Sequence, residues 1–221
     1  MAKKSGERGV SLIEFTLLAV VWVPLLLGTF AIGTTMVKAL QTIQIARDAA
    51  SLASRGVDFS YPANQAMLAR LGQDMGLTTT GGTGVVILSE ITYIGKYQCL
   101  ALNLVVDPTA NPPVPTTACT NYQHFVFARR LVVGNAAVRN SAFGDPAAGL
   151  ADATTGTIAL TDQVKTSGAR ADQFALLPKP VEDGSDGFQA GQTAYLAEAA
   201  FQAPGVPGTM ADTTTYSAAV F

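Results

Sequence analysis

The sequence is poor in charge. Asp, Glu, Lys and Arg make up 14% of its 221 residues, and the net charge is -2, whereas charged residues usually account for about 25% of a soluble domain. A protein that binds nucleic acid needs a basic stripe to neutralise phosphates. No such stripe is present, so we expect no nucleic-acid partner.

Histidine and cysteine, the residues of most catalytic and metal sites, are also scarce. The one histidine, His124, has no second histidine with which to form a metal site. The acidic turn at Glu182, Asp183 and Asp186 lacks the ligand spacing of a calcium loop, and no nucleophile-elbow pattern occurs. We therefore expect a protein that is not an enzyme and that carries no cofactor or metal.

The two cysteines are Cys99 and Cys119. If the C-terminal part lies outside the cytoplasm, the compartment favours a disulfide between them. The competing interpretation is two free buried thiols, which requires a reducing compartment. A bridge across the 19 intervening residues would stabilise the fold by about 3 kcal/mol.

One long apolar run stands out from the rest of the chain. Residues 15–37 carry no formal charge, and a membrane-spanning helix needs about 20 mainly apolar residues. Lys3, Lys4 and Arg8 precede the run, which predicts a cytoplasmic N-terminus and an exported remainder. No A-x-A cleavage site closes the run, so we expect the segment to be retained.

Glu14 stands at the start of this run. An unpaired carboxylate in hydrocarbon is costly, so Glu14 is either a functional group or a carboxylate held at headgroup depth. Pro24 lies inside the run, where we expect it to kink the helix. Small residues follow it and would let another helix approach closely: Gly28, Thr29, Ala31, Gly33, Thr34 and Thr35.

The helical pattern continues beyond the apolar run to Arg55, and Gly56 supplies a stop. Its apolar stripe is predicted to pack on the chain's own globular part: Leu40, Ile43, Ala46, Ala50 and Ala53. The chain therefore divides into a basic leader at 1–9, a long helix at 10–56 and an extracytoplasmic head at 57–221. The expected fold class is α+β, a long N-terminal transmembrane and stalk helix packed on a small antiparallel β-rich head.

The head opens with a helix predicted from Pro62 to about Met75, with a buried stripe formed by Met67, Leu68, Leu71 and Met75. Strands are predicted within 85–97, at 100–106, 124–133, near 157–160 and within 188–201. In the first, Ile87, Ile91 and Tyr93 should share a face, and in the third Phe125, Phe127, Leu131 and Val133 should share one. The tail from Ala203 is expected to be irregular, with Phe221 tucked into the head.

Gly9 is followed by four apolar or small residues and then Glu14, which resembles the processing site of type IV prepilins. The resemblance implies cleavage by a prepilin peptidase between Gly9 and Val10, and Glu14 then becomes the fifth residue of the mature chain. Val10 stands where the family usually has phenylalanine. In an assembly of packed helices, the Glu14 carboxylate can pair with the α-amino group of a neighbouring Val10.

A second resemblance is to TadE-like proteins, the minor pilins or pseudopilins of bacterial tight-adherence systems. It is carried by Gly9, Glu14, Phe15 and Pro24 and by the run 191–201, which joins a glycine, an aromatic and a glutamate. It implies a pilin-like subunit that leaves the inner membrane for a type IV or tight-adherence pilus, with other pilin subunits or copies of itself as partners and cell adhesion as one possible use. Contacts between helices are expected through Leu12, Phe15 and Leu18.

Two alternatives remain open from the sequence. The chain could be the major subunit that forms the bulk of the extracellular filament. It could also be an unprocessed, single-pass membrane-anchored binding domain in which the spacing of Gly9 and Glu14 is coincidental. In the pilin interpretations Leu12, Phe15 and Leu18 are buried by another copy, whereas in the anchor interpretation they face lipid.

Overall fold

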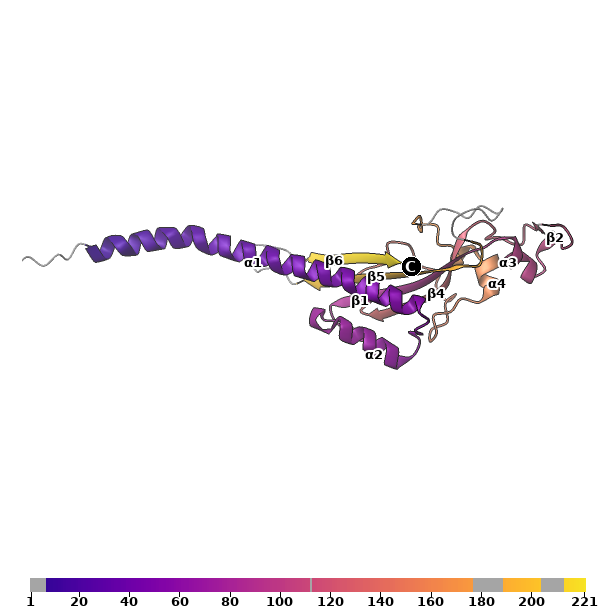
Figure 1. Cartoon of the computed structure of the whole chain (residues 1–221), viewed down its shortest axis with the longest axis horizontal. Helices are drawn as coiled ribbons and strands as arrows, with labels where there is room; N and C mark the ends of the chain where they lie inside the picture. Colours follow the sequence, from indigo (N-terminus) through magenta and orange to yellow (C-terminus); the bar gives the residue numbers. More distant parts are fainter. Residues whose placement is uncertain (1–6, 112, 177–188, 204–212) are drawn as a thin grey trace, which may run out of the picture.

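A long helix and a four-stranded antiparallel sheet form the framework of the molecule (Figure 1). The computed structural model describes residues 7–111, 113–176, 189–203 and 213–221, so the start of the basic leader and the acidic turn at Glu182, Asp183 and Asp186 lie outside the described residues. The sheet has the strand order β4-β1-β5-β6. Its strands are β1 (Gly84–Tyr93), β4 (Phe125–Gly134), β5 (Thr193–Ala203) and β6 (Thr213–Val220). This arrangement confirms the predicted α+β class.

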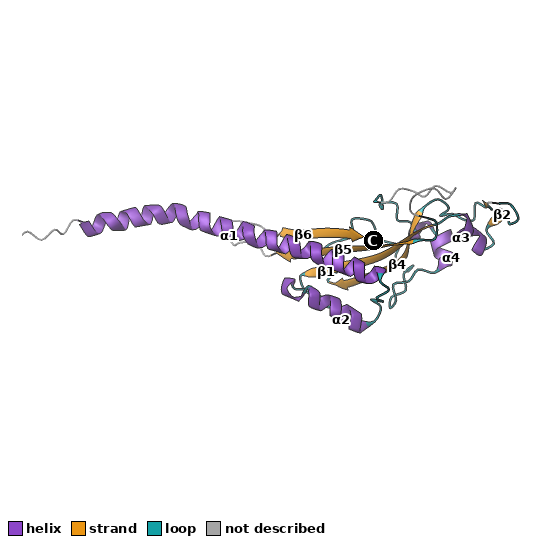
Figure 2. Cartoon of the chain, in the orientation of Figure 1, coloured by secondary structure: helices purple, strands orange, loops and turns teal. Residues whose placement is uncertain are grey.

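The remaining elements are short and flank the sheet (Figure 2). They are α2 (Pro62–Leu71), η1 (Gln73–Met75), α3 (Lys96–Ala101), β2 (Val105–Asp107), β3 (Val114–Pro115), α4 (Leu160–Lys165) and η2 (Ser167–Ala169). Strands β2 and β3 pair with each other in a separate two-stranded sheet. In Figure 1 they lie at the end of the head opposite to the projecting helix.

Helix α1 (Glu7–Ser54) passes through Pro24 without a break and ends two residues before Gly56, which adopts a φ of +84°. Only its second half packs on the head, over β5 and β6. The buried positions there recur at intervals of three and four: Thr42, Ile45, Ala46, Ala49 and Ala50. This spacing places them on one helix face.

The predicted stripe was therefore wrong at Leu40, which is exposed. Leu40 is two residues before Thr42, and two residues correspond to about 200° of rotation around the helix. On the sheet side, α1 packs on Ala197, Ala199 and Phe201 of β5 and on Val86 and Leu88 of β1. Alanines on both sides let the helix and the sheet approach closely.

The prediction that β4 carries four apolar residues on one face was wrong. Glu90 of β1 is opposite Arg129, but Ile91 is opposite Phe127, so Ala128 is an extra residue in β4. This β-bulge inverts the alternation of side chains. Residues before it, Phe125 and Phe127, belong to the core on the face away from α1, whereas Val133 after it packs beneath α1.

A second prediction was that Ile87, Ile91 and Tyr93 of β1 share a face. It agrees with the structure, because β1 pairs with β5 without a bulge and the alternation of its side chains is unbroken. The strand predicted at 100–106 was wrong: α3 occupies its first part and β2 begins only at Val105. Asn103 has a φ of +56°, a left-handed conformation that asparagine tolerates better than most residues. It turns the chain after α3, so Leu102 and Leu104 reach the core from a turn.

Two further predictions needed correction. In the helix after Pro62, Leu68 is buried, but Met67 and Leu71, four residues apart on one face, are exposed. The helix ends at Leu71, and the buried Met75 lies in η1. The tail contains strand β6, which pairs with β5 over its whole length, and Phe221 is exposed instead of tucked in. Near 157–160 only isolated bridges form, at Thr157 and Ile158, before α4 begins at Leu160.

Candidate functional site: the exposed half of helix α1

The first half of α1 projects away from the head and shows its apolar side chains on the surface (Figure 1). Phe15 leaves 72% of its surface exposed, Trp22 62% and Phe30 69%. A soluble monomer rarely exposes an apolar surface of this extent, and such a surface indicates contact with a membrane or with another chain. By length and composition, the helix can cross a bilayer.

The polar side chains of this half are satisfied within the helix itself. The hydroxyls of Thr16, Thr29, Thr34 and Thr35 each donate to a backbone carbonyl three or four residues earlier, at 2.9–3.0 Å. A hydroxyl bonded in this way does not need water. The threonines therefore do not oppose transfer of the helix into lipid or into a packed assembly.

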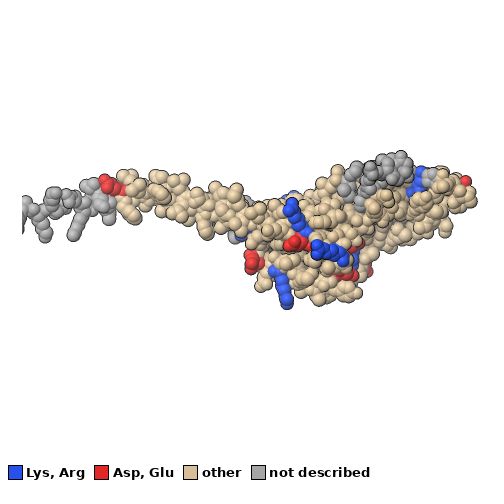
Figure 3. Space-filling model, viewed as in Figure 1, with Lys and Arg blue, Asp and Glu red and all other residues tan. Residues whose placement is uncertain are grey.

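Glu14 is the exception, because it is exposed and charged. In Figure 3 the acidic side chain at the outer end of the described helix is followed by a long stretch without charge. The next charged residue along α1 is Lys38, which is half-buried at the edge of the head. At 1.5 Å per residue, Glu14 and Lys38 are about 36 Å apart along the helix axis.

The structure places the predicted assembly residues along the outer half of this helix. Glu14 and Leu18 are four residues apart and share a face, Phe15 is adjacent, and all three are exposed together with Pro24. Gly9, Val10 and Leu12 lie in the helical backbone of α1, and the side chains of residues 7–12 lie outside the description. The predicted processing site and Glu14 are therefore parts of one continuous helix.

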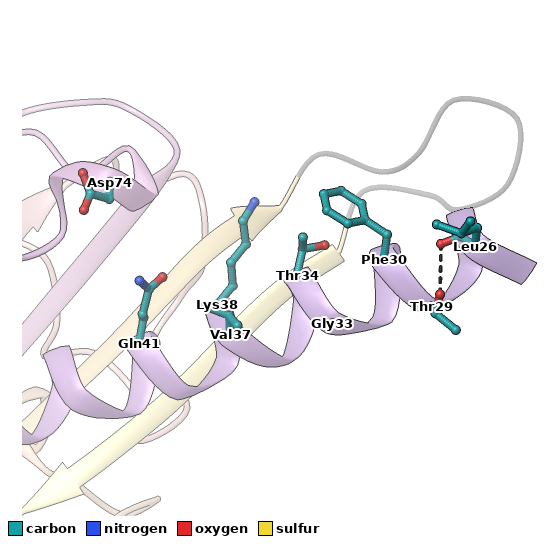
Figure 4. Close-up of a pocket in the computed structure, with 9 residues that line it drawn as sticks. All are labelled: Leu26, Thr29, Phe30, Gly33, Thr34, Val37, Lys38, Gln41 and Asp74. Atoms are coloured by element: carbon teal, nitrogen blue, oxygen red, sulfur yellow. Dashed lines mark hydrogen bonds between the residues drawn. The ribbon is translucent and has the colours of Figure 1, made fainter.

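An apolar groove runs along α1 where the helix meets the head (Figure 4). Its volume is about 700 Å³, and it is lined mainly by side chains and backbone of α1, with Asp74 of η1 across from them. The α1 residues are Leu26, Thr29, Phe30, Gly33, Thr34, Val37, Lys38 and Gln41. Figure 4 shows Lys38 extending on the same side of the helix as Thr34 and Phe30. Lys38 was not among the residues predicted from the sequence to form a site.

A second concentration of polar groups lies inside the head, on the sheet face away from α1. The carboxylate of Glu198 in β5 is 1% exposed. It accepts hydrogen bonds from the Ser141 hydroxyl, from the Ala142 N–H at 2.8 Å and from the Tyr216 hydroxyl at 2.8 Å. Because both carboxylate oxygens accept hydrogen bonds, this arrangement holds a loop and two strands together.

The two arginines that follow the bulge in β4 serve opposite faces of the sheet. Arg130 lies 3.9 Å from Glu198 and donates to Ser89 and to Asp145. Arg129 donates to Asp58, in the turn after α1, and to Glu90 at 3.5 Å. Each arginine therefore ties β4 to a different layer of the head.

These contacts also affect ionisation. Burial, reinforced by the hydrogen bond to Glu198, raises the pKa of Tyr216 well above its ordinary value. The backbone N–H of Ser60 donates to Asp58 and, with Arg129, holds the pKa of that carboxyl below its ordinary value. Tyr216 thus stays a hydrogen-bond donor and Asp58 stays an anion at neutral pH.

The predicted disulfide is present. Cys99 of α3 and Cys119 are bonded, with their Cα atoms 5.8 Å apart, and both are buried. The α3 end of the head lies far from the projecting half of α1 (Figure 1). His124 precedes β4, and its Nδ1 atom lies 3.3 Å from Oδ1 of Asp172 on the surface. The bridge therefore supports the head and is not part of the exposed helical surface.

Among the described residues, the apolar outer half of α1 with Glu14 is therefore the surface that most needs a partner. The sequence of the chain was compared with protein-family models and with characterised proteins, and its fold with solved structures. None of these comparisons gives a match.

Proposed function

We propose that this chain is a pilin-like structural subunit. A prepilin peptidase cuts it after Gly9, the outer half of α1 holds it in the inner membrane with the N-terminus in the cytoplasm, and α1 then assembles into or beneath a type IV or tight-adherence pilus. The observation that carries this proposal is the division of α1: its inner half packs on the sheet, while the stretch from Ile13 to Val37 is apolar, mostly exposed and bears one carboxylate, Glu14.

An apolar helix alone would serve equally well as a simple anchor, and Glu14 is the residue that distinguishes a pilin-like subunit from such an anchor. At the end of a membrane helix Glu14 can reach water, but among packed helices its carboxylate needs a cation beside it. Cleavage after Gly9 would create a cation, the α-amino group of Val10, four residues before Glu14 on the same face. In each chain the α-amino group and Glu14 lie at the same end of the helix. Parallel helices packed side by side would therefore bring the amino group of one copy near Glu14 of its neighbour, and pairing between the copies would neutralise both charges.

Packing within the assembly would come from the apolar surface of the outer half. Helices in lipid gain little hydrophobic free energy by associating, so close packing and polar pairing must supply the attraction. Leu12, Phe15 and Leu18 are the residues expected to contact neighbouring copies near Glu14. The disulfide fits a head outside the cytoplasm, where such bonds persist. The large head and the TadE-like features favour a minor subunit over a major one.

The first experiment identifies the mature N-terminus by mass spectrometry in cells that contain the prepilin peptidase. We expect the chain to begin at Val10. Gly9→Val should block the cut, and Gly6→Val, which changes the other glycine of the leader, should leave it intact. An N-terminus at Met1 or Ala2 in the presence of active peptidase would contradict the proposal and favour an unprocessed membrane anchor.

The second experiment separates processing from assembly. We expect Glu14→Ala and Glu14→Gln to be cleaved normally but to be recovered in filaments at a level lower by on the order of tenfold, the loss expected from breaking one buried ion pair partly compensated by solvent. Electron microscopy and quantitative immunoblotting of sheared filaments would measure it. An unchanged filament number in both variants would remove the proposed ion pair.

A further inference from the structure

Lys38 is placed on α1 in a way that the head does not explain. The residues that the structure describes offer it no ion-pair partner, although the carboxylate of Asp74 lies across the same groove. Its side chain points away from the axis of α1, on the same side of the helix as Thr34 and Phe30 (Figure 4). A cation at the rim of an apolar groove is suited to bind a carboxylate that arrives together with apolar side chains.

The surface of α1 beside Gly33, in this groove, is not covered by other described residues. A Cβ atom added at Gly33 would meet nothing within 4 Å, so no contact among the described residues requires glycine there. Glycine in a helix interior costs about 1 kcal/mol relative to alanine. In membrane helices, glycine at such a position allows a second helix to approach closely. Gly33 therefore leaves room for another chain to approach α1 closely in this groove.

We propose that this groove receives the N-terminal helix of a second copy of the chain, and that Lys38 of one copy pairs with Glu14 of the other. The inference rests on the proposed function and specifies one of its contacts. The charges are complementary, and Glu14 is the single charged residue among the described positions of α1 from Ile13 to Val37. With Glu14 level with Lys38, Val10 of the visiting helix lies level with Thr34, so the first turn of that helix lies against the part of the groove nearest the head.

The helix geometry sets the arrangement of the two copies. Glu14 and Lys38 are about 36 Å apart along α1 and about 120° apart around its axis. Pairing them between parallel copies displaces one copy by about 36 Å relative to the other. Because the two faces differ, the contact is heterologous and can repeat from copy to copy, as a filament requires.

The same separation suits the chain before assembly. The hydrocarbon core of a bilayer is about 30 Å thick, so a helix perpendicular to the membrane can place Glu14 and Lys38 at its opposite boundaries, both within reach of water. A copy that leaves the membrane moves its Glu14 outward by about one membrane thickness, to the level of Lys38 in a copy that is still in the membrane. At that point Lys38 replaces water as its partner.

This contact is distinct from pairing with the α-amino group of Val10. Val10 and Glu14 are separated by only about 6 Å along the axis, so an amino group would come from a copy with a small axial displacement. Lys38 would come from a copy with a large one. A carboxylate has two oxygens and accepts from both.

Zero-length coupling of carboxylates to amines with a carbodiimide tests the contact on purified wild-type filaments. We expect tandem mass spectrometry to find a peptide in which Glu14 is joined to Lys38. That link is intermolecular, because 24 residues of helix separate the two within one chain. Coupling of Lys38 to Asp74 without any to Glu14 would overturn the inference, and so would coupling of Glu14 to the Val10 amino group alone.

Charge exchange provides a second, independent test. Lys38→Glu should lower the incorporation of the chain into filaments by on the order of tenfold, and Glu14→Lys combined with Lys38→Glu should restore most of it. The control is Arg47→Glu, the same change of charge at an exposed position of α1 beside the head, which should assemble normally. Wild-type incorporation of the single Lys38→Glu variant would overturn the inference.

The outcomes also separate this contact from the proposed function. If the chain begins at Val10 and is present in filaments, but Glu14 is never coupled to Lys38, only the Lys38 contact is lost. If the chain is not cleaved and is absent from filaments, both proposals are overturned.

Discussion

At the scale of single residues, Glu198 is the strongest polar constraint in the head. Its carboxylate is buried beside the guanidinium of Arg130, which is itself buried. We predict that Glu198→Ala lowers the free energy of unfolding by about 3–5 kcal/mol, because it removes the acceptor of three hydrogen bonds and one of the two carboxylates beside the buried Arg130. Removing the carboxylate also leaves the Tyr216 hydroxyl without its acceptor.

The measurement is chemical unfolding of the full chain in detergent, followed by the near-ultraviolet circular dichroism of the tyrosines. Trp22 lies in the exposed half of α1 and does not report on the head. Glu90→Ala is the control, since Glu90 pairs with Arg129 at 3.5 Å in a partly exposed position and should cost less than about 1 kcal/mol. Equal losses in the two variants would show that burial of Glu198 adds nothing.

The disulfide is the second constraint at this scale. We predict that replacing both Cys99 and Cys119 with alanine lowers the free energy of unfolding by about 3 kcal/mol, because the bridge closes a loop of about 20 residues in the unfolded chain. Reduced wild-type protein is the reference, and it should match the double variant. Finding two free thiols in protein purified without reductant from its native compartment would contradict the bond.

At the scale of elements, the bulge in β4 decides which side chains enter which core. Deleting Ala128 would restore simple alternation, and it would carry Phe125 and Phe127 to the face under α1 or force β4 out of register with β1. We predict that the deletion variant shows no cooperative unfolding transition by near-ultraviolet circular dichroism. Deletion of Ala110, in the loop between β2 and β3, should leave the transition within about 1 kcal/mol of the wild type.

This bulge also shows where sequence reasoning ends. The length of α1 and the faces of β1 follow from local patterns, so the sequence was sufficient to predict them. The extra residue in β4 depends on the pairing of Glu90 with Arg129 across the sheet, which no pattern within β4 reveals. Strand β6 was missed because its threonines and alanines resemble a flexible tail, and it becomes a strand through pairing with β5.

Some residues of the candidate site have a signal in the sequence, whereas others are brought together only by the fold. A charge-free run headed by a carboxylate is visible in the sequence, so Glu14 was found. Lys38 ends the same run and could have been found by asking what bounds it on the other side. Glu198 had a signal as well, since it is a single charge among alanines in an apolar strand. Its partners Ser141 and Tyr216 are distant in sequence, and only the fold brings them together.

At the scale of the whole molecule, the second half of α1 is part of the head, whereas its first half is exposed and can be removed by truncation. Apart from Ala31, its buried residues begin near Thr42, so the head needs the second half of the helix and not the first. We predict that a chain comprising residues 38–221 is a soluble monomer with a cooperative unfolding transition. Size-exclusion chromatography without detergent and near-ultraviolet circular dichroism would measure both properties.

The contrasting variant comprises residues 55–221 and removes all of α1. It would expose Phe201, Ala197 and Ala199 of β5 and Leu88 of β1, which pack beneath the helix in the intact chain. An apolar sheet face of this kind drives aggregation, so we expect this variant to be insoluble or to elute as large oligomers. If residues 55–221 formed a stable monomer, the second half of α1 would be a separate stalk and not a layer of the head. If residues 38–221 still required detergent, an apolar surface of the head itself would have to face the membrane, and the outer half of α1 would no longer account for the need for a partner.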